Sequence, residues 1–117
     1  MSPLPTTIQA AARGETTFRT WASRTAATAL VTCHGELDLA AAPRAATALY
    51  AQLDADVQDL LVDLDGVTYL DCAGLRALID VALAAQATGA RVYLFRARGR
   101  PAELIEWARE RCPIAGL

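Results

Sequence analysis

The sequence lacks the residue combinations on which most enzymes and metal sites depend. Its only histidine, His34, directly follows Cys33. Neighbouring residues of a strand point to opposite faces, so these two side chains cannot form a nucleophile and base pair. The three cysteines contain no C-x-x-C pair, and neither G-x-x-x-x-G-K-[ST] nor G-x-G-x-x-G is present. We therefore expect no catalytic residue, no cofactor and no metal site, and a protein that is not an enzyme.

Long apolar runs, a secretory signal and a strong net charge are missing as well. Charged residues interrupt the most hydrophobic region, so no segment approaches the roughly 18 apolar residues that span a bilayer. The formal net charge is -2 and the sequence pI is near 5.3, which gives no general attraction for nucleic acid. The odd number of cysteines favours a reducing compartment. We therefore expect a cytoplasmic protein with no direct nucleic-acid or membrane partner.

The sequence does contain enough apolar residues for one folded domain. Hydrophobic residues make up 54% of the 117 residues and charged residues 21%. This balance is typical of a compact domain and excludes a disordered chain. Prolines and small polar residues predict a mobile tail at residues 1–13, followed by a single domain over residues 14–117.

Hydrophobic periodicity predicts elements in the order β β α β α β α. Residues 16–20 and 28–33 are expected to form a hairpin, after which Gly35 permits a turn. Residues 59–64 are apolar almost throughout, which is typical of a central strand covered on both faces. The other expected elements are a helix from residue 41 or 42 to 53, a helix over 75–87, a strand over 91–95 and a helix over 101–111. This order predicts an α/β fold, with a mixed sheet of about four strands and helices packed against it.

Two groups of residues could carry a binding function. Asp71, Cys72, Ala73 and Gly74 lie between a strand and a helix, whose first N–H groups favour negative charge. Cys72 is there either a reactive thiolate, which Asp71 opposes, or a small residue that fills a tight turn. The second group consists of four arginines around the last expected strand: Arg91, Arg96, Arg98 and Arg100. They form either a solvated loop or a patch for an acidic protein partner.

Two stretches of the sequence together resemble the STAS domain of anti-sigma factor antagonists. The first is GELD at residues 35–38, and the second is LLVDLDGVTYLDCAGLRAL at residues 60–78. The family pattern joins a G-E-L-D loop to a hydrophobic strand, an L-D-S-[SA]-G-L turn and a helix. The resemblance extends from about Thr17 to the end of the chain and implies a single STAS-like domain, in agreement with the order of elements expected above.

The resemblance also implies a function in partner switching. Antagonists of this family bind an anti-sigma factor that is also a serine kinase, and this factor then releases its sigma factor. The kinase phosphorylates the serine that follows the aspartate, and the added charge breaks the complex. Here Cys72 matches that phosphoacceptor serine and Ala73 follows it, so neither position carries a hydroxyl. The first hypothesis is therefore an antagonist that serine phosphorylation cannot inactivate.

Two further hypotheses differ in partner and in chemistry. One is a STAS scaffold or interaction subunit of another assembly, and the other is a thiol sensor in which oxidation of Cys72 imitates the phosphate charge. The sequence fits either a monomer or a weak dimer.

The motif match also predicts which residues bind the partner. The expected surface has Gly35, Glu36, Leu37 and Asp38 on one side, Asp71, Cys72, Ala73 and Gly74 on the other, and Arg76 as a polar contact. Glu36 and Asp38 have alternative structural roles, at a strand end and as a helix cap respectively.

Overall fold

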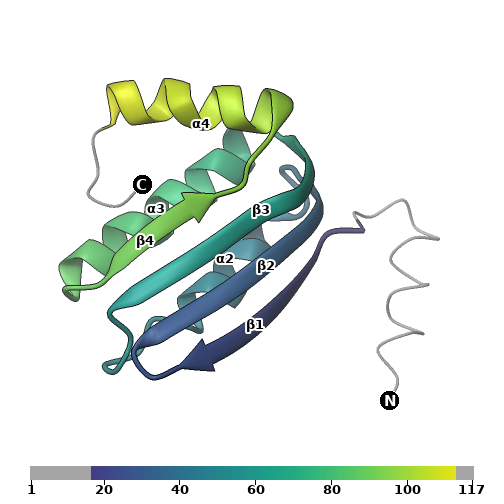
Figure 1. The fold of residues 1–117 in the computed structure, drawn as a ribbon. Helices are drawn as coiled ribbons and strands as arrows, with labels where there is room; N and C mark the ends of the chain where they lie inside the picture. Colours follow the sequence, from purple (N-terminus) through teal and green to yellow (C-terminus); the bar gives the residue numbers. More distant parts are fainter. Residues whose placement is uncertain (1–16, 113–117) are drawn as a thin grey trace, which may run out of the picture.

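The computed structural model describes residues 17–112 of the chain, and the tail expected at residues 1–13 lies outside them. The elements, labelled as in Figure 1, follow the order expected from the sequence. The strands are β1 (Arg19–Thr25), β2 (Thr28–Leu37), β3 (Asp59–Leu70) and β4 (Arg91–Phe95), and the helices are α2 (Ala42–Tyr50), α3 (Cys72–Ala87) and α4 (Gly99–Arg111).

The four strands form one mixed sheet in the order β1-β2-β3-β4. Strands β1 and β2 are an antiparallel hairpin, whereas β2 pairs with β3, and β3 with β4, in parallel. Figure 1 shows α2 and α3 together on one face of the sheet, and α4 across the end of the strands. The predicted α/β class and the mixed sheet of four strands are confirmed.

The core lies between the sheet and the helices α2 and α3. Alternate residues of the two inner strands point into it and are buried: Ala29, Val31 and Cys33 of β2, and Leu60, Val62 and Leu64 of β3. The intervening residues face the other side of the sheet, where Leu61 is half-buried beside Leu30. Strand β3 is therefore an inner strand as predicted, but the expectation that both of its faces are covered is wrong. Its apolar run arises because Leu61 adds an apolar side chain to the open face.

Strand β1 is shifted from the position predicted for it. The sequence predicts residues 16–20, whereas the strand spans Arg19–Thr25 and is followed by a tight turn at Ala26 and Ala27. Ala26 has a φ of 52°, the left-handed conformation that favoured hairpin turns need. Because β1 is an edge strand with mostly exposed side chains, Trp21 among them at 53%, no alternation of apolar and polar residues marks its bounds.

Strands β2 and β3 run past their predicted ends, at residues 33 and 64, to Leu37 and Leu70. The turn expected at Gly35 is instead an irregularity within β2, where the register with β3 shifts. Gly35 has a φ of +107°, and a Cβ there would lie 3.0 Å from the Cα of Phe18. Glycine is thus required both by the backbone conformation and by the lack of space.

Helix α2 begins at Ala42 as predicted, with Pro43 in its first turn, but it ends at Tyr50 instead of residue 53. Helices α3 and α4 begin at Cys72 and Gly99, earlier than the predicted residues 75 and 101, because their first residues do not belong to the apolar stripes that reveal the helices. None of the helices within residues 17–112 is long and apolar enough to cross a membrane.

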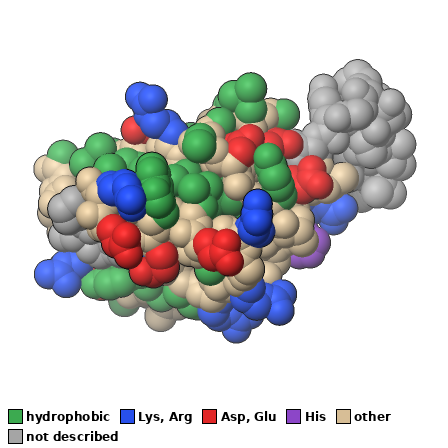
Figure 2. Space-filling view, turned by 90° about the horizontal axis from the view of Figure 1, so that it is seen from above, with side chains coloured by type: hydrophobic (Ala, Val, Ile, Leu, Met, Phe, Trp, Pro, Cys, Tyr) green, Lys and Arg blue, Asp and Glu red, His purple; other side chains and the backbone are tan. Residues whose placement is uncertain are grey.

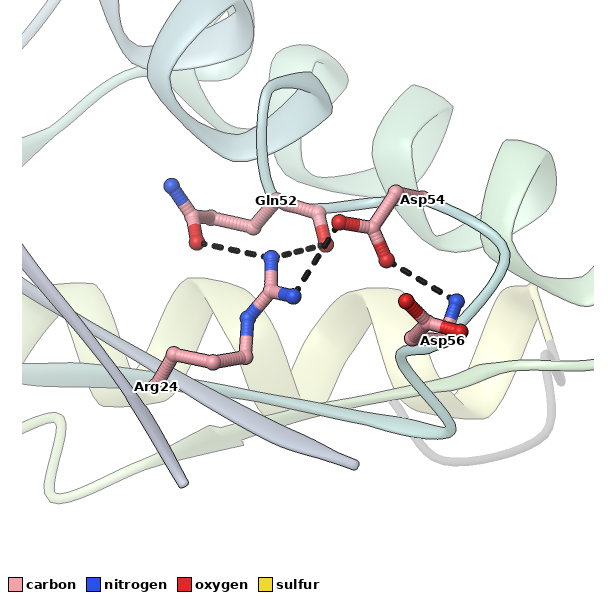
Figure 3. Close-up of polar contacts among 4 residues, drawn as sticks. All are labelled: Arg24, Gln52, Asp54 and Asp56. Atoms are coloured by element: carbon pink, nitrogen blue, oxygen red, sulfur yellow. Dashed lines mark hydrogen bonds and ion pairs between the residues drawn. The ribbon is translucent and has the colours of Figure 1, made fainter. Parts of the chain in front are cut away.

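A polar cluster ties β1 to the segment that follows α2 (Figure 3). Arg24 Nη1 lies 3.1 Å from Asp54 Oδ2, and Arg24 Nη2 donates to the carbonyl oxygen of Gln52 at 3.4 Å. The N–H of Asp56 donates to Asp54 Oδ1 at 2.9 Å. This bond and the Arg24 guanidinium hold the pKa of Asp54 below its ordinary value. The cluster stabilises the hairpin end of the sheet.

Candidate functional site

The two segments of the sequence motif meet at the carboxyl ends of β2 and β3. Parallel pairing continues as far as Leu37 of β2 and Leu70 of β3. Helix α2 follows the first strand after a short turn, and α3 follows the second almost directly. Residues 35–38 and 71–74 therefore lie side by side at one edge of the sheet.

Asp71 makes three hydrogen bonds here, one within its own segment and two to residues at the end of β2 and in the turn that follows it. Its Oδ1 accepts from the N–H of Gly74 at 2.9 Å, which makes Asp71 the N-cap of α3. Its Oδ2 accepts from the N–H of Leu39 at 3.1 Å, and its own N–H donates to the carbonyl oxygen of Leu37 at 3.4 Å. Asp71 thus fixes the start of α3 against the turn that follows β2. An aspartate directly before a helix is the sequence signal for its capping role, but no local signal predicts the bond from Leu39.

Gly74 allows α3 to approach the end of β2 closely. A Cβ at this position would lie 2.2 Å from the carbonyl oxygen of Leu37 and 2.9 Å from Leu70 Cδ1, so no side chain fits there. Gly35, Leu37 and Gly74 are all buried. These three expected site residues therefore shape the surface from beneath and present no side chain to it.

The other expected residues reach the surface. Glu36, Cys72 and Arg76 are exposed, and Asp38, Asp71 and Ala73 are half-buried. Arg76 Nε lies 3.6 Å from Asp80 Oδ2, one turn further along α3, and the Arg76 side chain is 79% exposed.

Asp38 stabilises the turn that leads into α2. Its Oδ1 accepts from the N–H of Ala41 at 3.0 Å. The N-cap position of α2 is Ala41 itself, which makes no side-chain capping bond. The alternative role predicted for Asp38, as cap of the following helix, is therefore wrong. Asp38 lies before the turn, and the helix begins only after the turn, at Ala42.

The motif does not identify two large exposed apolar side chains near Asp71 and Cys72. Leu39, in the turn after β2, is 74% exposed, and Tyr69, near the end of β3, is 49% exposed. Leu39 could have been found as a leucine in a turn that is otherwise polar or small. Tyr69 could not, because Thr68 and Tyr69 are both exposed and break the alternation of the strand.

The cysteines and the histidine differ in their surroundings. Cys33 is buried, and burial, with a further contribution from Asp63, raises the pKa of its thiol to about 12. His34 is exposed, and its ring meets that of Trp21 edge-on with centroids 6.3 Å apart. Cys33 and His34 thus lie on opposite faces, as predicted. Cys72 is exposed at the first residue of α3. Residues 17–112 contain no group of three or more side chains that could hold a metal ion.

Two of the four arginines near β4 are paired with acids of β3. Arg96 Nε lies 3.3 Å from Asp63 Oδ1, and Arg96 Nη2 lies 3.1 Å from Asp65 Oδ2. Arg98 Nε lies 3.2 Å from Asp65 Oδ1. These pairs attach the segment after β4 to β3 and favour the interpretation as a solvated loop over that of a patch for an acidic partner.

Comparisons with solved structures identify proteins of similar fold. An anti-sigma factor antagonist from Mycobacterium paratuberculosis is 25% identical, with a TM-score of 0.62 over 80% of this chain and 81% of that chain. The unphosphorylated form of SpoIIAA, a Bacillus cell fate determinant, is 14% identical, with a TM-score of 0.67 over 77% of this chain and 80% of that chain. The murine Solute Carrier 26 family member A9 anion transporter is 20% identical with a TM-score of 0.65, over 73% of this chain but only 14% of the transporter.

The family is identified by a comparison at the level of sequence. Comparison with curated proteins yields no match. The family description "STAS domain", in contrast, matches residues 22–109, a region that extends from β1 into α4 and includes both segments of the site. The chain therefore belongs to the STAS domain family.

Proposed function

We propose that this STAS protein is an anti-sigma factor antagonist that binds a serine-kinase anti-sigma factor and that serine phosphorylation cannot inactivate. It would act by partner switching in the cytoplasm of a bacterium to regulate sigma-factor-dependent transcription, as a binding protein and not as an enzyme. The family match supports this proposal, as do two solved antagonists of similar fold, of which the chain spans 81% and 80%.

The observation that carries the proposal is the exposed Cys72 at the start of α3. Cys72 stands where the family pattern has its phosphorylated serine, and Ala73 follows it. A thiol is close to a hydroxyl in size, so the shape needed for docking is retained, while a serine kinase finds no hydroxyl to modify. The complex would then stay in its bound form.

The charge around Cys72 explains why a phosphate there would oppose docking. A phosphate adds between one and two negative charges. The neighbouring Asp71 cannot turn away from such a group, because its two carboxylate oxygens accept from Leu39 and Gly74. Docking would therefore remove two adjacent negative groups from water, which is unfavourable unless the partner neutralises both.

The test is an affinity capture from the lysate of the native host with two baits, the unmodified protein and Cys72→Ser. Partners and residue 72 are then identified by mass spectrometry. We expect both baits to recover a serine-kinase anti-sigma factor, with phosphate on the serine variant alone. Recovery of other proteins without any such kinase would exclude the antagonist function.

Charged variants at the same position test whether Cys72 lies in the interface. Cys72→Asp and Cys72→Glu should weaken the complex with the recovered kinase by at least about tenfold, because each imitates part of the phosphate charge. Cys72→Ala is the matched control and should bind as the unmodified protein does. Unchanged affinity in both charged variants would place Cys72 outside the interface.

Two alternatives are each supported by one observation. The likeness to a transporter, of which this chain spans 14%, favours a STAS module within a larger assembly. The capture experiment would then return subunits of that assembly instead of a kinase. The exposed thiol of Cys72 favours a redox sensor. A thiol titration in which Cys72 reacts no faster than the exposed Cys112 would exclude this function.

A further inference from the structure

A cavity of about 760 Å³ lies beside Cys72, between the end of β3 and helix α4. Tyr69 and Cys72 line one side of it, and Leu104 and Trp107 of α4 line the other. Tyr69 is 49% exposed and Trp107 is 51% exposed, so two aromatic rings stand half out of the protein around this cavity. Aromatic side chains at a surface pocket are typical anchors of protein interfaces. The sequence motif does not include this part of α4.

Acidic side chains outnumber basic ones around the cavity. Asp71 and Glu103 line it together with Arg100, while Glu106 and Glu110 lie beside Trp107 further along α4, together with Arg111. Figure 2, seen from the α4 side of the molecule, shows hydrophobic side chains with both acidic and basic ones around them. The excess of acidic groups around the cavity is complementary to an apolar side chain with basic neighbours.

Glu103 has no ion-pair partner among the described residues, and neither has Arg100 at the same rim. Glu106 pairs with Arg109, and Glu110 lies 3.5 Å from Arg111. Arg100 and Glu103 are therefore the charged groups at the rim that can pair with a partner without breaking an existing pair. A segment with basic residues matches Glu103 and Asp71, and an acidic residue in it would match Arg100.

The open face of the sheet carries the second exposed tryptophan, Trp21, and two of the acids on this face are already paired with arginines. Asp63 and Asp65 on that face are paired with Arg96 and Arg98. Trp21 is 53% exposed, almost the same fraction as Trp107. The open face therefore offers a matched control for the cavity and not an equivalent site.

We propose that the cavity between β3 and α4 receives a large apolar side chain from a basic segment of the partner. The docking surface then extends from Cys72 onto α4. The Arg111 guanidinium lies over one face of the Trp107 ring, 4.6 Å from its centroid, so Tyr69 and the rest of the Trp107 ring enclose the inserted side chain. Identification of the partner as an anti-sigma factor rests on the proposed function, whereas the chemistry of the segment rests on the cavity alone. The acidic flanks disfavour nucleic acid as the occupant.

Tryptophan fluorescence provides the first test, because the chain contains only two tryptophans. Trp21→Phe leaves Trp107 as the only indole, and Trp107→Phe leaves Trp21. The probes are two alanine-based helical peptides with leucines on one face, flanked by arginines in one peptide and by glutamates in the other. The arginine peptide should shift the emission of Trp21→Phe to shorter wavelength and protect it from acrylamide, with no change in Trp107→Phe. The glutamate peptide should do neither.

Three results of this titration would overturn the inference: no response to the arginine peptide, equal responses of the two variants, or equal responses to the two peptides. Thermal unfolding of both variants beforehand establishes that each is folded. This test is independent of the identity of the natural partner.

The anti-sigma factor recovered by the capture experiment provides the second test. Trp107→Ala should weaken its binding by at least about tenfold, and Trp21→Ala by less than about twofold. Binding that is unaffected by Trp107→Ala would overturn the inference and leave the proposed function intact. Failure to recover any anti-sigma factor would overturn the proposed function, and the peptide titration alone would then decide the inference.

Discussion

Replacement of Asp71 tests how the two segments of the site are held together. Asp71→Ala removes the capping bond from the N–H of Gly74 and the bond from the N–H of Leu39. Loss of an N-cap costs about 1 kcal/mol. Loss of the exposed second bond costs roughly 0.5–1 kcal/mol more, because water can replace the acceptor. The free energy of unfolding should therefore fall by about 1.5–2 kcal/mol.

The variant Asp71→Asn distinguishes the bond from Gly74 from the bond from Leu39. In Asp71→Asn the amide oxygen can still accept from Gly74, but the amide NH₂ then faces the N–H of Leu39, which needs an acceptor. Because Asn and Asp are comparable N-caps, this variant should lose only roughly 0.5–1 kcal/mol. Asp80→Ala on the same helix is the control, because Asp80 makes only a surface pair with Arg76 and should lose less than about 0.5 kcal/mol.

Thermal unfolding and amide hydrogen exchange measure these effects. In a domain of this size, about 1 kcal/mol corresponds to a Tm change of roughly 4–8 °C, so Asp71→Ala should unfold roughly 6–16 °C lower than the unmodified protein. The amide of Leu39 should exchange faster in both Asp71 variants. A Tm for Asp71→Ala equal to that of Asp80→Ala, or an unchanged exchange rate at Leu39, would refute the role assigned to Asp71.

Three further perturbations test the packing and the titrating groups. Gly74→Ala should cost about 3 kcal/mol in chemical denaturation, because its Cβ would overlap the carbonyl oxygen of Leu37. A loss no larger than that of Gly99→Ala, which has open space and only an unfavourable φ of +60°, would contradict this. Burial raises the pKa of Cys33 from 9.0 to about 12, so the unfolded chain loses this proton first and stability should fall by about 1.4 kcal/mol per pH unit in that range. Cys33→Ala should remove this dependence of stability on pH. Equal slopes in the variant and the unmodified protein would show that other groups cause it. Asp54→Asn should lower the Tm at neutral pH, and the difference should vanish as the pH falls below 3.8 and through the lowered pKa of Asp54. A Tm difference that persists in acid would show that the charge of Asp54 does not cause it.

The sequence predicts those features that depend on neighbouring residues. The GELD stretch and the turn at Asp71 and Gly74 resemble the family motif, and an aspartate directly before a helix is a local signal of a cap. The α/β class follows from the order of periodic segments. The central position of β3 follows from its apolar run, although that run overstates how much of the strand is covered.

The features missed by sequence reasoning depend on contacts between distant residues. The bond from Leu39 to Asp71 joins residues that are 32 positions apart and becomes visible only when β2 and β3 are paired in register. The wall of the cavity on α4 is another such feature. In the sequence Trp107 has no mark of a binding site, and it lines the cavity only because α4 packs across the end of the sheet. The sequence predicts strand β1 at the wrong residues because its side chains are exposed and carry no periodic pattern.

Because Cys72 is the first residue of α3, a charge there affects the stability of the fold and binding at this surface in different ways. A negative charge there stands at the positive end of the helix dipole and stabilises a helix by about 0.3–1 kcal/mol. A charged variant such as Cys72→Asp should thus be at least as stable as the unmodified protein, so a loss of binding in it could not be ascribed to unfolding. The same reasoning applies to a phosphate on Cys72→Ser, which should weaken binding at this surface, if the proposed function holds, without unfolding the domain.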